Sequence, residues 1–141
     1  MIASALKQFE LLAEFNDEDR ECIFELLEER SVRQGRRLFG EGSEAEGMVL
    51  VVTGRVRVEG KRCEKPEVVE APFVIGALSL VNVGPRESTL VAETQCEVLM
   101  LPRTSYRRLV DDYPRTACRL AEAIVDDVAG LVRPVLDWLV G

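Results

Sequence analysis

The chain has 141 residues, of which 47% are hydrophobic and 30% are charged, and its formal net charge is −7. This length is enough for one domain that buries about two thirds of the surface of its unfolded chain. The acidic balance argues against unaided binding to nucleic acid or to an anionic membrane, and no segment is apolar over the length that a bilayer-spanning helix needs. The amino terminus also lacks the basic start and long apolar run of a signal peptide. We therefore expect a cytoplasmic protein with neither a nucleic-acid nor a membrane partner.

The reactive side chains are sparse. Histidine is absent, which removes the commonest general base and a frequent metal ligand. The four cysteines form no C-x-x-C pair, and we interpret them as buried or half-buried thiols in a reducing compartment, with a disulfide or metal site as the alternative. They are Cys22, Cys63, Cys96 and Cys118. The sequence contains no nucleophile with its base, no Walker motif and no metal cluster, so we expect no enzyme, no catalytic residue, no metal site and no required cofactor.

The first part of the chain favours helices, which we place at about residues 4–30. An apolar series at helical spacing comes first. Asn16 is a typical N-cap residue, followed by three carboxylates in the first turn of the helix. The apolar series is Leu6, Phe9 and Leu12, and the buried face of the capped helix is expected to consist of Ile23, Leu26 and Leu27.

Short strands punctuated by glycine follow at about residues 31–102. Eight of the ten glycines lie between Gly35 and Gly84. Val56 and Val58 alternate with charged residues, which is typical of a half-buried antiparallel strand, and Pro102 closes the last strand. Turn signals recur about every ten residues, as in a compact β-roll or barrel. The predicted strands are residues 36–39, 48–52, 55–59, 68–69, 89–92 and 97–101.

The segment from Phe73 to Thr89 carries the strongest functional signal. Gly76 lets the backbone approach a ligand closely, and free N–H groups at the start of the next turn favour an anion. Arg86 can grip phosphate oxygens through its planar guanidinium. A surface arginine after a proline turn is the alternative interpretation of Arg86, and Thr89 fits a strand residue best.

This segment resembles the phosphate-binding cassette of the cyclic nucleotide-binding domain family, whose pattern is F-G-E-L-A-L, a short spacer, and then P-R-A-A-T. The matching residues are Gly76, Leu78, Leu80, Pro85, Arg86 and Thr89. Residues 38–43, 48–58 and 97–103 are also similar to motifs of the family, as are Tyr106 and Tyr113-Pro114, in the same order. The resemblance spans about residues 5 to 132.

The resemblance implies a mainly β fold with flanking helices. Eight strands would form an antiparallel, jelly-roll-like β-roll that encloses the cassette. C-terminal helices at about residues 103–140 would follow, the last of them closing over the ligand. Residues 1–141 would then form a single domain of this family.

The resemblance also implies a ligand site in which Arg86 pairs with the cyclic phosphate and nearby backbone N–H groups assist. The candidate ligand-binding residues are Gly76, Ala77, Leu78, Arg86, Glu87 and Ser88. Ala77 replaces the family's glutamate, which accepts a hydrogen bond from the ribose 2′-hydroxyl, and such a loss costs about 1.5–3 kcal/mol. Residues 130–132 align approximately with a polar, base-contacting position of the family and offer no polar side chain.

Glu87 occupies a position where relatives usually carry a small residue. We expect its side chain to point to solvent or to a neighbouring loop. In the alternative, the side chain turns inward, repels the phosphate and occupies Arg86 itself. A threonine here can favour guanine in relatives, so its absence leans away from cyclic GMP.

The C-terminal stretch contains an apolar seam at alternating spacings of four and three, with a second apolar stripe beside it. A helix that is apolar over so much of its circumference needs two partners. We predict the β-roll and a second copy of the helix; the alternative is a helix packed wholly on its own domain. Pro134 should kink or break this helix, and Gly130 weakens the turn before it. The seam consists of Ala117, Ala121, Ile124, Val128, Leu131, Val135 and Trp138.

Two functions fit these features. The first is a regulatory, signal-transducing module that binds a cyclic nucleotide, with cAMP favoured, or a related anionic ligand, and signals through its C-terminal helix. The alternative is a degenerate domain that has lost nucleotide binding and acts as a homodimerisation or protein-interaction module. The sequence ends soon after the last helix, so we expect no helix-turn-helix domain.

Overall fold

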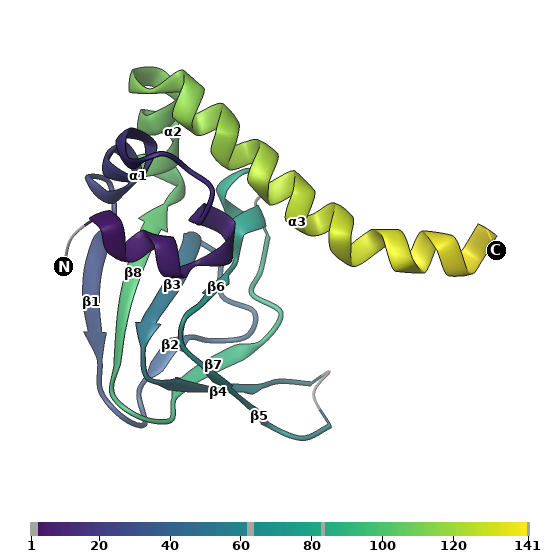
Figure 1. Cartoon of the computed structure of the whole chain (residues 1–141). Helices are drawn as coiled ribbons and strands as arrows, with labels where there is room; N and C mark the ends of the chain where they lie inside the picture. Colours follow the sequence, from purple (N-terminus) through teal and green to yellow (C-terminus); the bar gives the residue numbers. More distant parts are fainter. Residues whose placement is uncertain (1–2, 62–63, 83, 141) are drawn as a thin grey trace. The chain divides into compact units, whose positions relative to one another are not determined.

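The computed structural model describes residues 3–61, 64–82 and 84–140, and the chain divides into two compact units (Figure 1). One unit comprises Met1–Glu25 and Arg107–Gly141, and its described elements are helices. The other, Leu26–Tyr106, contains eight strands among its described residues. The predicted fold class, mainly β with flanking helices, is therefore confirmed, and the assignment of residues 1–141 to one domain stays a prediction.

The strands form two four-stranded sheets in which every paired neighbour is antiparallel. The first sheet has the order β1-β8-β3-β6 and the second has the order β2-β7-β4-β5. This arrangement is the β-roll that the resemblance implied. The strands are β1 (Glu28–Val32), β2 (Arg37–Phe39), β3 (Gly47–Thr53), β4 (Arg55–Glu59), β5 (Glu67–Glu70), β6 (Phe73–Ile75), β7 (Thr89–Ala92) and β8 (Cys96–Pro102).

Alternating side chains from both sheets form the core of this unit. Because successive side chains of a strand point to opposite faces, residues two apart share one face. Val49 and Val51 of β3 thus belong to the same cluster as Leu90 and Ala92 of β7, in the other sheet. Val56, Cys96, Val98 and Met100 complete the buried cluster.

Two strands escaped the sequence prediction. β1 lies at residues 28–32, within and just beyond the span assigned to N-terminal helices, and four of its five residues are exposed. It forms the edge of its sheet and pairs with β8 along its whole length. β6 has only three residues, all half-buried. A half-buried strand is recognised in a sequence by alternating apolar and polar residues. Neither β1 nor β6 has this alternation.

The N-terminal helices are η1 (Ala3–Gln8) and η2 (Glu10–Leu12), both of the 3₁₀ type, and α1 (Asp17–Phe24). Leu6, Phe9 and Leu12 are buried, and their spacing of three fits the three residues per turn of a 3₁₀ helix. The predicted cap is confirmed, since the backbone N–H of Asp19 donates to Oδ1 of Asn16 over 2.8 Å. α1 ends at Phe24, so the prediction that Leu26 and Leu27 lie on its buried face is wrong; both are half-buried and follow the helix.

Two helices follow the strands, α2 (Arg103–Asp112) and α3 (Pro114–Val140). Of the two predicted effects of Pro134, a kink or a break, the structure shows the first: α3 continues across Pro134, and Figure 1 shows the helix changing direction in its yellow C-terminal part. Proline lacks the N–H that would bond the carbonyl of Gly130, four residues earlier, and this loss explains a bend without a break.

The apolar seam of α3 differs between the two halves of the helix. Ala117 and Ile124 are buried, whereas Leu131, Val135 and Trp138 are 73%, 55% and 80% exposed. The change occurs near Val128, which is half-buried. Only the C-terminal half therefore presents an open apolar face.

Three cysteines lie among the described residues and all three are free thiols. Cys96 is buried and Cys22 is half-buried, as predicted. Cys118 is exposed on α3, where its sulfur lies 3.6 Å from Oε1 of Glu122, so its predicted burial is wrong. Cys63 lies outside the described residues. In the described ranges no cluster of potential ligands could hold a metal ion, and no helix has the length and apolar character to cross a membrane.

One buried carboxylate joins α1 to α3 within the helical unit. The side chain of Asp19 is 6% exposed. It accepts a hydrogen bond from Oγ1 of Thr116 over 2.6 Å and another from Nη1 of Arg119 over 2.5 Å. Thr116 is itself buried. Asp19 therefore fixes the start of α3 against α1.

We predict that Asp19→Ala lowers the free energy of unfolding by about 1–3 kcal/mol, because the buried hydroxyl of Thr116 loses its acceptor. Urea unfolding measures the change. Asp127→Ala removes an exposed carboxylate from α3, in the same unit, and should change stability by less than about 0.5 kcal/mol. Equal effects of the two substitutions would contradict this role of Asp19.

Candidate ligand-binding site

The segment between β6 and β7 forms a turn, a short helix and a loop. Gly76 follows β6 with φ 75° and ψ 25°, a left-handed conformation that glycine adopts without steric cost. The 3₁₀ helix η3 (Ala77–Leu80) begins at the next residue. Its N-terminal turn is closed by the N–H of Ser79, which donates to the carbonyl of Gly76 over 2.9 Å.

The loop between β2 and β3 runs beside the second half of this segment. The N–H of Arg86 donates to the carbonyl of Ser43 over 2.7 Å, and the carbonyl of Arg86 accepts from the N–H of Gly42 over 2.9 Å. A third bond joins the N–H of Ala45 to the carbonyl of Gly84 over 2.9 Å. These bonds fix the backbone from which the Arg86 side chain starts.

Three neighbours hold the Arg86 guanidinium in place. Nη2 donates to the carbonyl of Gly47 over 3.0 Å, and Cζ lies 4.2 Å from the centroid of the Phe39 ring. On a third side the guanidinium occupies the space beside Gly76, where a Cβ atom would overlap Nη1. The residue as a whole is only 8% exposed.

This buried cation has no carboxylate as a direct partner. Within the described part of the chain, Arg86 takes part in no ion pair. Burial lowers the pKa of Arg86 from its usual value, the charge of Glu46 raises it in part, and the charge of Arg103 lowers it further. A guanidinium in this state can bind a carboxylate or phosphate through two parallel N–H groups.

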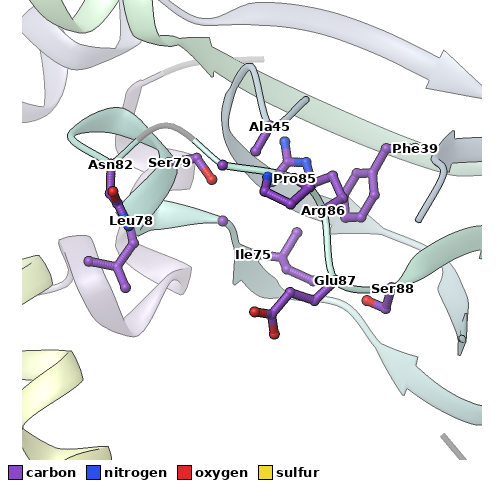
Figure 2. Close-up of a pocket in the computed structure, with 12 residues that line it drawn as sticks. Phe39, Ala45, Ile75, Leu78, Ser79, Asn82, Pro85, Arg86, Glu87 and Ser88 are labelled. Atoms are coloured by element: carbon purple, nitrogen blue, oxygen red, sulfur yellow. The ribbon is translucent and has the colours of Figure 1, made fainter. Parts of the chain in front are cut away.

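A cavity of about 630 Å³ opens beside Arg86, within the β unit (Figure 2). Its volume falls within the range of about 300–1,000 Å³ that is usual for small-molecule sites. Figure 2 shows the carboxylate of Glu87 directed away from the guanidinium of Arg86. The lining residues are Phe39, Ala45, Ile75, Gly76, Leu78, Ser79, Asn82, Gly84, Pro85, Arg86, Glu87 and Ser88.

Five of the six predicted site residues line this cavity. They are Gly76, Leu78, Arg86, Glu87 and Ser88. Ala77 is half-buried on η3 and is not among the lining residues. Glu87 is exposed, in keeping with the expected direction of its side chain. The contacts of these residues with a ligand stay a prediction.

Sequence reasoning missed several residues of the site. Phe39 lines the cavity and stacks on Arg86, and it belongs to residues 38–43, one of the segments that supported the resemblance. Membership of that segment was the sequence signal that could have placed Phe39 at the site. Asn82 and Ser79 supply polar groups to the cavity from positions without a pattern. The carbonyl of Gly47 contributes a backbone atom, which leaves no trace in sequence.

We predict that Gly76→Ala displaces the Arg86 guanidinium and destabilises the protein. The substitution adds an overlap with Nη1 to the strain of a left-handed alanine, and overpacking of this kind costs about 1–3 kcal/mol. Thermal and urea unfolding measure the loss.

Two other glycines provide matched controls. Gly42 also has a positive φ, 82°, but a Cβ atom there would point into open space, so Gly42→Ala isolates the strain of the backbone. Gly84 lines the same cavity with open space and no positive φ, so Gly84→Ala should be nearly neutral. If Gly76→Ala costs no more than Gly42→Ala, the tight packing of Arg86 on Gly76 is refuted.

Comparison with known proteins identifies relatives of this chain. A family model described as cyclic nucleotide-binding domain matches residues 29–113. Lysophospholipase nte1 of Neurospora crassa is 31% identical over 102 residues, which cover 70% of this chain and 7% of that protein. The CRP-like cAMP-activated global transcriptional regulator of Mycobacterium tuberculosis is 26% identical over 119 residues, which cover 70% of this chain and 53% of that protein.

A solved structure has a similar fold over most of this chain. The N-terminal domain of a transcriptional regulator from Streptomyces coelicolor A3(2) has a TM-score of 0.79 and 25% sequence identity, and the match covers 90% of this chain and 94% of that one. By contrast, the chain spans only a small part of the fungal lysophospholipase and about half of the mycobacterial regulator.

Proposed function

Because this chain belongs to the cyclic nucleotide-binding domain family, we propose that it is a regulatory module that binds a cyclic nucleotide, with cAMP favoured, or a related anionic ligand in the cavity beside Arg86. One observation carries the proposal: Arg86 is 8% exposed, lines a cavity of about 630 Å³ and has no ion-pair partner within the described part of the chain. A buried charge without a partner is costly, and an anion in the cavity removes that cost.

The remaining walls of the cavity suit a nucleotide. Phe39, Ile75 and Leu78 provide apolar surface, while Ser79 and Asn82 provide hydrogen-bonding groups. Small-molecule sites typically combine a mainly apolar lining with a few polar groups that fix the orientation of the ligand. The preference for cAMP draws on the mycobacterial relative, which is named as cAMP-activated.

The role we propose is regulatory, not catalytic. The region shared with the Neurospora lysophospholipase is 7% of that protein. The enzymatic activity of the lysophospholipase can therefore lie in the other parts of that protein. The free thiols of Cys22 and Cys96 fit a reducing compartment, and we place the module in the cytoplasm. We propose that ligand binding is signalled to other molecules through the C-terminal helix α3.

We predict that Arg86→Ala weakens cAMP binding at least tenfold, since charged hydrogen bonds contribute about 1.5–3 kcal/mol. Arg86→Lys keeps the charge and loses the two-pronged grip, so it should bind with intermediate affinity. Titration calorimetry with cAMP, and with cyclic GMP for comparison, measures both variants. Arg36→Ala removes an exposed arginine of the same unit and should leave the affinity unchanged. Equal affinity in Arg86→Ala and the unmodified chain would refute the site.

The open face of α3 supports a second candidate function, a dimerisation or protein-interaction module. Leu131, Val135 and Trp138 are exposed on one seam, and a continuous apolar face of this kind is typical of an interaction surface. We propose that a second copy of the helix covers it about a two-fold axis, with Trp138 as the anchor. Asp126 and Asp127, which are exposed, would stay in water.

We predict that the double variant Leu131→Glu and Val135→Glu is a folded monomer, because like charges then oppose each other in the paired seam. Light scattering at high micromolar concentration measures the mass, and circular dichroism checks the fold. Val125→Glu places a charge on an exposed position outside the seam and should leave the dimer intact. A monomeric unmodified chain at the same concentration would exclude the dimer. Ile124 is unsuitable for this test because it is buried.

A further inference from the structure

The polar groups of the cavity are unevenly divided between hydrogen-bond donors and acceptors. Among the described residues that line it, Arg86 is the one polar side chain that is buried, and its guanidinium carries donors only. The other polar side chains of the lining lie at half-buried or exposed positions; they are Ser79, Asn82, Glu87 and Ser88. The most buried polar group of the cavity therefore donates hydrogen bonds and accepts none.

The backbone of the cavity wall has its carbonyl groups largely engaged. The carbonyl of Leu78 accepts from two backbone N–H groups, over 3.1 and 2.8 Å. The side chain of Arg103 donates to the carbonyl of Ser79 over 3.0 Å and to that of Ala45 over 2.6 Å. In all, six lining residues have a carbonyl that already accepts a hydrogen bond within the protein: Ala45, Gly76, Leu78, Ser79, Gly84 and Arg86.

The start of η3, next to the Arg86 guanidinium, adds no side-chain acceptor. Gly76 and Leu78 line the cavity. Ala77, which lies between them in the chain, is half-buried and has only a methyl group as its side chain. Ile75 continues the same wall with an apolar side chain. The oxygens of an anion can thus be bound by Arg86, whereas a hydroxyl beside that anion would meet apolar carbon at this wall.

Glu87 supplies the one carboxylate of the described lining, and it is an exposed residue. Figure 2 shows its carboxylate directed away from the Arg86 guanidinium. The hydroxyls of Ser79 and Ser88 are neutral, and hydrogen bonds between neutral groups contribute less than those to charged groups. The strongest acceptor of the cavity therefore lies apart from the position at which Arg86 would hold an anion.

We propose that this site is selective for an anion that has no hydroxyl beside its charged group, so that a 2′-deoxyribose or a ligand without a sugar fits at least as well as a ribose. The inference rests on the proposed function and narrows its ligand class. Arg86 binds the anionic oxygens, which are acceptors only. A hydroxyl held next to them would lose its water and gain no partner, and such burial is unfavourable.

The pair of ligands cAMP and 2′-deoxy-cAMP isolates this preference. The two share the base and the cyclic phosphate, and they differ only in the 2′-hydroxyl, which lies on the carbon next to one that carries the phosphate. Titration calorimetry on the unmodified chain measures both affinities. We expect 2′-deoxy-cAMP to bind at least as tightly as cAMP, and up to about tenfold more tightly, because it buries no unpartnered hydroxyl.

Two variants change the wall of the cavity and keep the same pair of ligands. Ala77→Glu adds a carboxylate at the start of η3, between two residues that line the cavity. It should shift the ratio of the two affinities about tenfold towards cAMP, since the hydroxyl then gains a charged acceptor. Val81→Glu is the matched control, because it adds the same charge just after η3 at an exposed residue that does not line the cavity. It should leave the ratio unchanged.

A preference of the unmodified chain for cAMP by about threefold or more overturns the proposal, because the site then recognises the hydroxyl. An equal shift of the ratio in Ala77→Glu and Val81→Glu also overturns it, since the wall at η3 is then not the cause. If circular dichroism shows that Ala77→Glu does not fold, the ratio in the unmodified chain decides. If the unmodified chain binds neither nucleotide, the proposed function itself fails, and this inference fails with it.

Discussion

The packing of the Arg86 guanidinium against the Gly47 carbonyl, the Phe39 ring and the bare Cα of Gly76 is the constraint on which the site depends. Removing a charge from water costs several kcal/mol even after relaxation. One hydrogen bond to a carbonyl and one cation–π contact offset about 1–3 kcal/mol of that cost. The packing of the two-sheet core must offset the remainder of this desolvation cost. A ligand that binds only the folded chain at a hundred times its Kd would add about 2.7 kcal/mol of stability.

The sequence predicted the fold wherever local pattern and long-range packing agree. In β4, Val56 is buried and Val58 packs against the same core cluster, so the alternation of these two valines with charged residues in the sequence revealed the strand. β1 lacks this pattern, since Glu28 and Glu29 are exposed. Its pairing partner, β8, lies more than sixty residues along the chain, and pairing over such a separation has no local signature. The three residues of β6 are too few to display a period.

The site, like the fold, was predictable where its residues form a local motif and not where its contacts are long-range. Gly76 and Arg86 belong to one local motif, so their types and spacing supported the resemblance that predicted a ligand site here, and both line the cavity. The side chain of Arg103, by contrast, donates hydrogen bonds to the carbonyls of Ser79 and Ala45, which lie 24 and 58 positions away in the chain. Every residue carries a backbone carbonyl, so the side chains at Ser79 and Ala45 give no sign of these hydrogen bonds in the sequence. Pro134 illustrates the opposite case: its effect is local, yet the helix bends and continues because neighbouring turns keep their bonds.

The proposed roles of Arg86 and α3 are linked by thermodynamics as well as by the connection of the chain. α2 starts at Arg103 in the β unit and continues into the helical unit, where α3 follows it. Suppose that occupation of the cavity changes the affinity of the exposed half of α3 for a partner. The partner must then change the affinity for the ligand by the same factor. Leu131 and Trp138 are largely exposed in the chain without a partner. The ligand affinity measured on that chain is therefore the affinity in the absence of any partner on α3. A partner that favours the liganded arrangement would raise the affinity for the ligand. If that partner is a second copy of the chain, the ligand affinity would depend on the concentration of the chain.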